Sequence, residues 1–148
     1  MKTIHYTHSL DGMRPGQLAG LHEGWPRPPS PETHLESLRA MNAVVLAIDP
    51  AADQVVGFIC GMTDGVLVLY VWDLEVRRGY QGRGIEEELL RRLLEKHGRL
   101  YQVNAHPSAE RVALFAKAGF VPYRPDQAVA MTRMRMDQQD GRRKTNVE

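Results

Sequence analysis

The sequence predicts a mixed α/β fold in which a mostly antiparallel sheet is flanked by helices on both faces. Apolar runs rich in β-branched residues occupy 43–48, 54–62 and 66–76, and the short turns between them predict an antiparallel meander. Leucines spaced four apart follow over 85–97 and predict an amphipathic helix. Residues 99–104 predict a short strand, which should lie parallel to the strand at 66–76 because a helix connects the two.

The N-terminal third of the chain is expected to add one strand and two helices. Residues 3–8 alternate in polarity and predict the first strand, and 10–21 predict a short helix. The stretch 23–31 holds four prolines and a glycine, which favour a loop over a regular element. Ser30 is placed to cap the second helix, which begins with a proline and runs to about Met41.

The C-terminal part is expected to hold one more helix and a final hairpin. The helix follows 106–108, and Gly119 is suited to end it because glycine adopts the left-handed conformation without strain. Residues 120–122 and 128–134 would form the hairpin. The elements then follow the order β-α-α-β-β-β-α-β-α-β-β, a mixed sheet with helices on both faces.

Composition and charge exclude several functional classes. The chain has 148 residues, and we expect one domain over 1–135 and a polar, disordered tail over 136–148. A net charge of +1 gives no support for binding to nucleic acid or to a membrane surface. The single Cys60 excludes an internal disulfide framework, and His5 and His8 have no third partner for a metal. No apolar run reaches the about 18 residues of a membrane span, and the start lacks a signal peptide's apolar core, so a cytoplasmic location is expected.

A basic, glycine-rich loop joins the strand at 66–76 to the helix at 85–97. Glycine lets a backbone approach a ligand closely, and a helix N-terminus offers free N–H donors with partial positive charge. Such a junction binds anions, and phosphates in particular. The spacing matches neither a P-loop nor a dinucleotide fingerprint. The loop's glycines and arginines are Gly79, Gly82 and Gly84 and Arg77, Arg78 and Arg83.

The stretch from Leu74 to Ile85 resembles the coenzyme A motif of the GCN5-related N-acetyltransferases (GNAT family). The core of that motif, Gln/Arg-x-x-Gly-x-Gly/Ala, is matched by Gln81, Gly84 and, imperfectly, Glu86. A second family segment, a helix followed by Gly-Phe, is matched by 109–120. The resemblance covers most of 1–135 and implies the acyl-CoA N-acyltransferase fold, with acetyl-CoA as co-substrate, an amine as acceptor and no metal.

The resemblance also implies where the coenzyme lies. The pantetheine arm would follow the end of the strand at Leu74 and Val76, and would spread that strand from its neighbour at 101–104. The amide of Leu74 would polarise the thioester carbonyl. Further contacts are implied for Asn104, Ser108 and Phe115. The pyrophosphate would be held by the backbone N–H groups of Gln81, Gly82, Arg83, Gly84, Ile85 and Glu86.

Two residues depart from the family pattern. Glu86 stands where the family prefers glycine or alanine, and its carboxylate would repel phosphates unless it points away and only its N–H faces the ligand. Phe115 stands where the family often has a tyrosine that protonates the leaving thiolate. Either another group does this work, or the thiolate leaves unaided, which a thiol pKa near 8.5 allows.

The base and the acceptor pocket are expected on and around the same strand. Glu75 is the first candidate for general base and Asp73 the second, and a structural ion pair is the alternative for both. Strict alternation places these two on one face and Tyr70, Trp72, Leu74 and Val76 on the other, unless a bulge intervenes.

Aromatic side chains are the candidates for the acceptor pocket. Tyr70 and Trp72 could line it or belong to the core. His22 and Trp25 lie in the loop before the second helix, a segment that covers the acceptor site in the family. A surface position is the alternative for His22.

Together these features predict an N-acetyltransferase in which an amine attacks acetyl-CoA directly within a ternary complex. The acceptor would be a small-molecule or peptide amine, and a homodimer stays open because the family often dimerises. The main alternative is a coenzyme-A-binding module that has lost catalysis, which Glu86 and Phe115 favour. An anion binder unrelated to coenzyme A would leave the Gly119–Phe120 segment unexplained.

Overall fold

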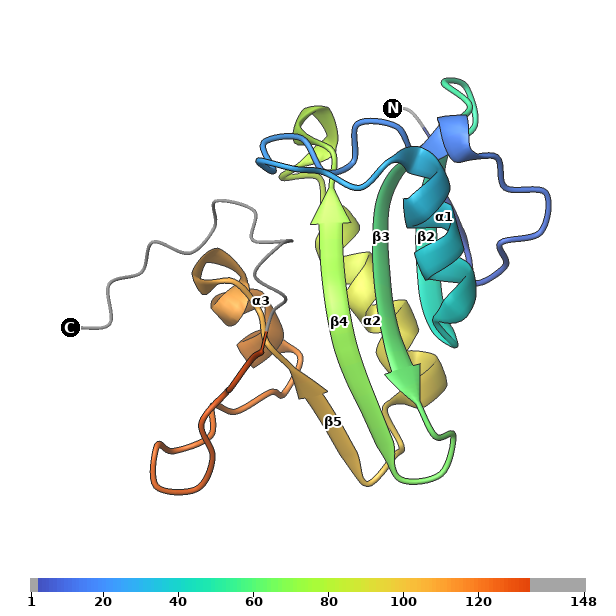
Figure 1. The fold of residues 1–148 in the computed structure, drawn as a ribbon. Helices are drawn as coiled ribbons and strands as arrows, with labels where there is room; N and C mark the ends of the chain where they lie inside the picture. Colours follow the sequence, from blue (N-terminus) through green and yellow to red (C-terminus); the bar gives the residue numbers. More distant parts are fainter. Residues whose placement is uncertain (1–2, 134–148) are drawn as a thin grey trace.

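The computed structural model describes residues 3–133, which form a five-stranded sheet with helices on both faces (Figure 1). The strands lie in chain order across the sheet. Every neighbouring pair is antiparallel except the last, which is parallel. The strands are β1 (His5–Thr7), β2 (Ala43–Asp49), β3 (Gln54–Thr63), β4 (Val68–Val76) and β5 (Gln102–Ala105).

Two apolar clusters hold the helices against the sheet. On one face, α2 (Ile85–His97) buries Leu89 and Leu93 against β2, β3 and β4. On the other face, α1 (Pro31–Ala40) buries Leu35 and Leu38 against Phe58. β2 and β3 are buried on both sides, which is why their sequences read as continuous apolar runs. The short helical segments are η1 (Pro15–Leu18), η2 (Arg78–Tyr80), η3 (Ala109–Arg111) and α3 (Val112–Lys117).

The two long helices, α1 and α2, begin and end within one residue of the ranges that the sequence predicts. Ser30 caps α1 by accepting a hydrogen bond from the Thr33 amide at 3.1 Å. Gly98 ends α2 in the right-handed region, and a side chain there would meet the Leu94 carbonyl oxygen at 2.4 Å. Along α2, Arg91 pairs with Glu88 and Glu95, and Arg92 also pairs with Glu88.

Two expected elements are wrong in the described residues. The helix over 10–21 shrinks to the single turn of η1, because Gly12 and Gly20 adopt left-handed φ angles of +70° and +79° that end a helix. The hairpin over 120–122 and 128–134 is absent as far as residue 133, where the chain makes turns and extended segments without strand pairing.

Two strand boundaries also differ. β4 starts at Val68 rather than at residue 66, because the Asp64 carboxylate accepts hydrogen bonds from the amides of residues 66–68 and holds them in a turn. β5 starts at Gln102 rather than at residue 99, since residues 98–101 turn away from α2. The expected tail over 136–148 lies outside the described residues. None of the helices described is long and apolar enough to cross a membrane.

Candidate functional site

A bulge at Trp72 divides β4 and turns its second half over. Asp73 pairs with Cys60 of β3 while Val71 pairs with the next residue, Gly61, so Trp72 has no partner on β3. The alternation therefore reverses, and the expectation that Tyr70, Trp72, Leu74 and Val76 share one face is wrong. The α2 face carries Leu69, Val71, Leu74 and Val76, whereas Tyr70, Asp73 and Glu75 lie opposite residues of β3 on the α1 face.

The two parallel strands separate just beyond this bulge. Their pairing ends where Val71 meets Ala105, the last residue of β5, and Figure 1 shows the end of β5 pointing away from β4. The opening thus begins after Ala105 and not at 101–104, because residues 102–105 are paired with β4. The opening holds a cavity of about 310 Å³, which we call the cleft. It is lined by Trp25, residues 71–75 and 105–108, Arg111 and Phe115.

The loop ahead of α2 leaves the N-terminus of that helix open. Gly82 and Gly84 adopt left-handed φ angles of +72° and +76°, and Gly84 occupies the N-cap position without a side-chain cap. A side chain on Gly79, Gly82 or Gly84 would meet nothing within 4 Å, so the space in front of the loop is free. The first N–H groups of a helix have no acceptor inside it. Here they point out of a glycine loop, which is the geometry of an anion cradle.

The polar side chains of this loop make contacts with different parts of the fold. The side-chain amide of Gln81 donates to the Val76 carbonyl oxygen at 3.0 Å and ties the loop to the end of β4. Arg77 is fixed by bonds to the carbonyl oxygens of Val55 and Ala19, so it joins β3 to the N-terminal loop. Arg83 lies over the Tyr80 ring, with its guanidinium carbon 5.0 Å from the ring centre.

One arginine links the cradle to the cavity. Arg111 lies 3.3 Å from a Glu75 carboxylate oxygen and 3.2 Å from a Glu86 oxygen, and its side chain is only 14% exposed. Burial raises the pKa of Glu75, and the Arg111 charge opposes that rise. Glu86 therefore points toward Arg111 rather than standing alone beside the cradle.

Asp73 forms the second polar group of the cavity wall. One of its oxygens accepts a hydrogen bond from the Leu74 amide at 2.9 Å, and the other lies 3.7 Å from His22 Nε2. His22 is buried, so the alternative of a surface position is wrong, and it packs edge-on against Trp25 and His34 behind the residues that line the cavity. The Leu74 amide, expected to contact the thioester, is thus held by its neighbour's carboxylate in this state.

The open N-terminus of α2 and the cavity with its two carboxylates are joined by Arg111, which contacts Glu86 and lines the cavity. The model of the Acetyltransferase (GNAT) family matches residues 9–120. The chain belongs to the GNAT acetyltransferase family. Members of this family use acetyl-CoA as co-substrate.

Solved structures extend this likeness over nearly the whole chain. A candidate acetyltransferase from Deinococcus radiodurans R1 is 36% identical, with a TM-score of 0.80 and 90% of each chain covered. A GNAT-family acetyltransferase from Streptococcus pneumoniae TIGR4 is 25% identical, with a TM-score of 0.70 over 90% of this chain and 98% of the other. Glucosamine-6-phosphate N-acetyltransferase from Arabidopsis thaliana, at 13% identity and a TM-score of 0.62, covers 89% of this chain and 98% of its own and shares the fold alone. No curated protein matches the sequence.

Other residues expected to contact ligands in this GNAT protein lie in and around the cleft. Phe115 is buried, and it lines the cavity and packs edge-on against Phe120. Ser108 lines the cavity but does not cap the following helix with its side chain. The Tyr70 hydroxyl bonds to His106 Nδ1, and Trp72 is 61% exposed at the cavity rim.

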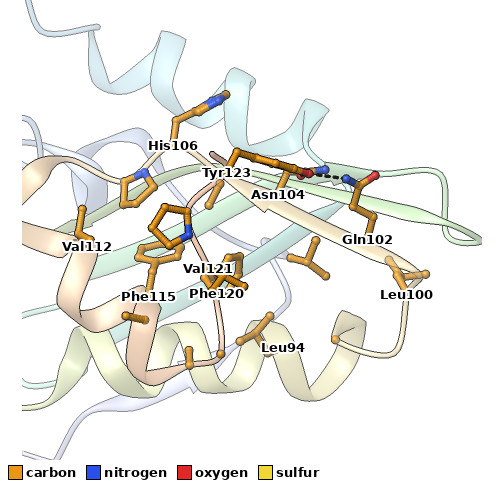
Figure 2. A pocket seen from close by; sticks show the side chains of 18 of the residues that line it. Leu94, Leu100, Gln102, Asn104, His106, Val112, Phe115, Phe120, Val121 and Tyr123 are labelled. Atoms are coloured by element: carbon orange, nitrogen blue, oxygen red, sulfur yellow. Dashed lines mark hydrogen bonds between the residues drawn. The ribbon is translucent and has the colours of Figure 1, made fainter. Parts of the chain in front are cut away.

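Asn104 is directed away from the cleft of the acetyltransferase. Its side chain accepts a hydrogen bond from the Tyr123 hydroxyl at 2.9 Å, and Gln102 donates to the same hydroxyl at 2.5 Å. Figure 2 shows this group in a larger hollow of about 1350 Å³ beyond β5, where Leu94, Val112 and Phe120 are among the lining residues. That hollow meets the cleft at residues 105–107 and Phe115, but neither Asp73 nor Glu75 lines it.

Sequence reasoning missed Arg111. Its partner Glu86 was recognised as a misplaced acid, which signals that some cation must compensate it. Six arginines stand nearer to Glu86 in the sequence, so nothing in the spacing points to a residue 25 positions away. The contact between η3 and α2 is a tertiary one between segments that are distant in the sequence.

Proposed function

We propose that this GNAT protein is an N-acetyltransferase that transfers the acetyl group of acetyl-CoA to an amine by direct attack in a ternary complex. The single observation that supports this best is the contact that joins the open N-terminus of α2 to the cavity between β4 and β5. Arg111 lines the cavity together with Asp73 and Glu75, and it also contacts Glu86 in the first turn of the uncapped α2 helix.

The backbone amides of Gly82 to Glu86 would hold the pyrophosphate, and that of Gln81 would join them by giving up its 3.3 Å hydrogen bond to the Arg78 carbonyl oxygen. The free space before Gly82 and Gly84 accommodates such a group, and their left-handed backbone aims N–H groups outward. Leu74 and Val76 lie along the path of the pantetheine arm. If the thioester oxygen takes the Leu74 amide, Asp73 gives up that bond and keeps His22 as its neighbour.

Glu75 is the proposed general base. The amine nitrogen forms a bond to the acetyl carbon, the carbon–sulfur bond breaks, and coenzyme A leaves as a thiolate. The proton of the attacking amine passes to Glu75, directly or through one water. Burial raises the pKa of Glu75, which makes its carboxylate a stronger base than an exposed one.

Direct attack is favoured over an acetyl-cysteine intermediate. Cys60 is buried, and burial together with the nearby Asp73 raises the pKa of its thiol to about 12. A thiol with so high a pKa holds almost no thiolate at pH 7, so it is a poor nucleophile. Phe115 has no proton to donate, so the thiolate leaves without the acid that the family often supplies.

The acceptor site would be the aromatic and acidic end of the cleft. Trp25, Trp72 and His106 line it together with Asp73 and Glu75. Aromatic faces and carboxylates attract ammonium groups, which is consistent with a small-molecule or peptide amine. No nucleic acid or membrane is proposed as partner, and a homodimer stays a proposal.

A screen of amines with acetyl-CoA, read by release of free thiol, tests this function. The Glu75→Gln variant should lower kcat by about 10²–10⁴, the usual contribution of a general base, and change the Kd for acetyl-CoA by less than about twofold. Binding of acetyl-CoA without turnover of any amine would favour the alternative, a coenzyme-binding module. That alternative now rests on Phe115 alone, because Arg111 compensates the charge of Glu86.

A further inference from the structure

The contacts of Arg111 join the two walls of the cleft. Its guanidinium reaches Glu75 on β4 and Glu86 on α2, at 3.3 Å and 3.2 Å. Both carboxylates are partly buried, with side chains 19% and 27% exposed. Two carboxylates therefore share one cation, and taking Arg111 away would leave two partly buried negative charges at the mouth of the proposed coenzyme site.

Glu86 has a second place it can occupy. It is the second residue of α2, in a first turn that also holds Glu87 and Glu88. Carboxylates in a first turn are attracted to the free N–H groups and the positive end of the helix dipole. No side chain caps Gly84, so those N–H groups are open to Glu86 as much as to a phosphate. A carboxylate folded back onto the cradle would compete with the phosphates and repel them.

Arg111 removes that competitor. A charge-assisted bond between guanidinium and carboxylate is stronger than a neutral one and has a fixed geometry. Here both Nε and Nη2 of Arg111 face the same Glu86 oxygen, which directs the carboxylate toward η3 and away from the loop at Gly82 and Gly84.

We propose that Arg111 is a positioning residue that holds Glu86 off the α2 N-terminus, and so keeps the cradle free for the phosphates of coenzyme A. Through its second contact it also orients the carboxylate of Glu75 toward the cleft. Arg111 thus compensates the departure of Glu86 from the family motif. This inference rests on the proposed function, since it assigns a role to Arg111 in the same coenzyme site.

Calorimetric titration with acetyl-CoA tests the inference through a double-mutant cycle. The Arg111→Met variant should bind about tenfold or more weakly than the natural protein, because Glu86 is released. Glu86→Ala should bind as tightly or more tightly. The double variant Arg111→Met/Glu86→Ala should return to within about twofold of Glu86→Ala, since the competitor is gone. The double variant removes one charge of each sign, so it leaves no unpaired charge at position 86. If Arg111→Met alone fails to fold, the double variant can still be compared with Glu86→Ala.

Arg91→Met is the matched control. Arg91 also binds two glutamates, Glu88 and Glu95, on α2, but its side chain is 56% exposed and it is not among the residues that line the cavity. Its loss should leave the affinity for acetyl-CoA unchanged.

The possible outcomes distinguish a failure of this inference from a failure of the proposed function. If Arg111→Met weakens binding by the same factor with and without Glu86, Arg111 contacts the coenzyme itself or serves only the fold, and the inference is overturned. An Arg111→Met variant that binds as the natural protein does would overturn it as well. If the natural protein binds no acetyl-CoA, the proposed function fails together with the inference.

Discussion

The N-termini of α1 and α2 differ in how the free N–H groups of their first turns are satisfied. Both helices leave their first N–H groups without an acceptor inside the helix. At α1, Ser30 accepts from the Thr33 amide, and Pro31 at the first position has no N–H to satisfy. At α2, Gly84 provides no side chain, and the space before it is free. The first N–H groups of α1 are satisfied within the protein, and we call this N-terminus the closed end. Those of α2 are left for a ligand, and we call this N-terminus the open end.

The surroundings of the two ends agree with this difference. The α1 helix packs on the sheet face that holds Phe58 and presents His34 to the interior. The α2 helix starts beside the opening between β4 and β5, where Arg111 directs Glu86 away from the loop. A stable fold needs only the first arrangement, so the second indicates a site.

The largest expected effect is on ligand binding at the open end. Gly84→Val places a β-branched residue at a left-handed φ of +76°, which costs on the order of 1–2 kcal/mol and favours a flipped peptide. The N–H groups would turn away and the side chain would fill the free space. Binding of acetyl-CoA should become undetectable by calorimetry.

Gly12→Val is the control for that variant. Gly12 also has a left-handed φ, of +70°, and free space around it, but it lies in the N-terminal loop. Similar strain there should lower stability and leave the affinity for acetyl-CoA unchanged. Equal losses of affinity in both variants would show that Gly84 matters only for folding.

The next effect concerns acid stability at the closed end. His34 is 6% exposed, and neither ring nitrogen has a hydrogen-bond partner. Burial, aided by the neighbouring His22, lowers its pKa from 6.5 to about 4. As pH falls from about 6.5 to about 4, the unfolded chain takes up the proton first, so the free energy of unfolding falls. The difference of about 2.5 pKa units corresponds to at most about 3 kcal/mol.

His34→Phe should remove this acid sensitivity. Urea unfolding of the natural protein and the variant at pH 7 and pH 4.5 measures it, and the variant should lose less stability between the two. If both proteins lose the same amount, His34 does not titrate in this way. The affinity for acetyl-CoA at pH 7 should be equal in the two, because His34 lies outside the cleft.

The sequence predicted the parts of the fold that depend on local pattern. The buried strands β2 and β3, the leucine face of α2 and the Ser30 cap each follow from a short run of residues. The cradle followed from its glycines. The Trp72 bulge did not, because its position depends on pairing with β3, and so the sequence misplaced Tyr70 relative to Glu75. Arg111 was missed for the same reason, since its contacts need three elements brought together.

The smallest effect is the removal of the cap at the closed end. Ser30→Ala should destabilise the protein by about 1 kcal/mol, because the Thr33 amide loses its partner. Thermal unfolding measures this loss. The affinity for acetyl-CoA should not change, and a clear weakening would mean that the two helix ends are coupled.

The most direct test follows the backbone amides of both helix ends in one amide-resolved NMR titration with acetyl-CoA. We expect the amides of Gly82, Gly84 and Glu86 to shift with a saturable dependence on acetyl-CoA, while those of Glu32 and Thr33 stay in place. Unchanged amides in the α2 loop, or equal shifts at both ends, would contradict the claim that the open end of α2 is the coenzyme site.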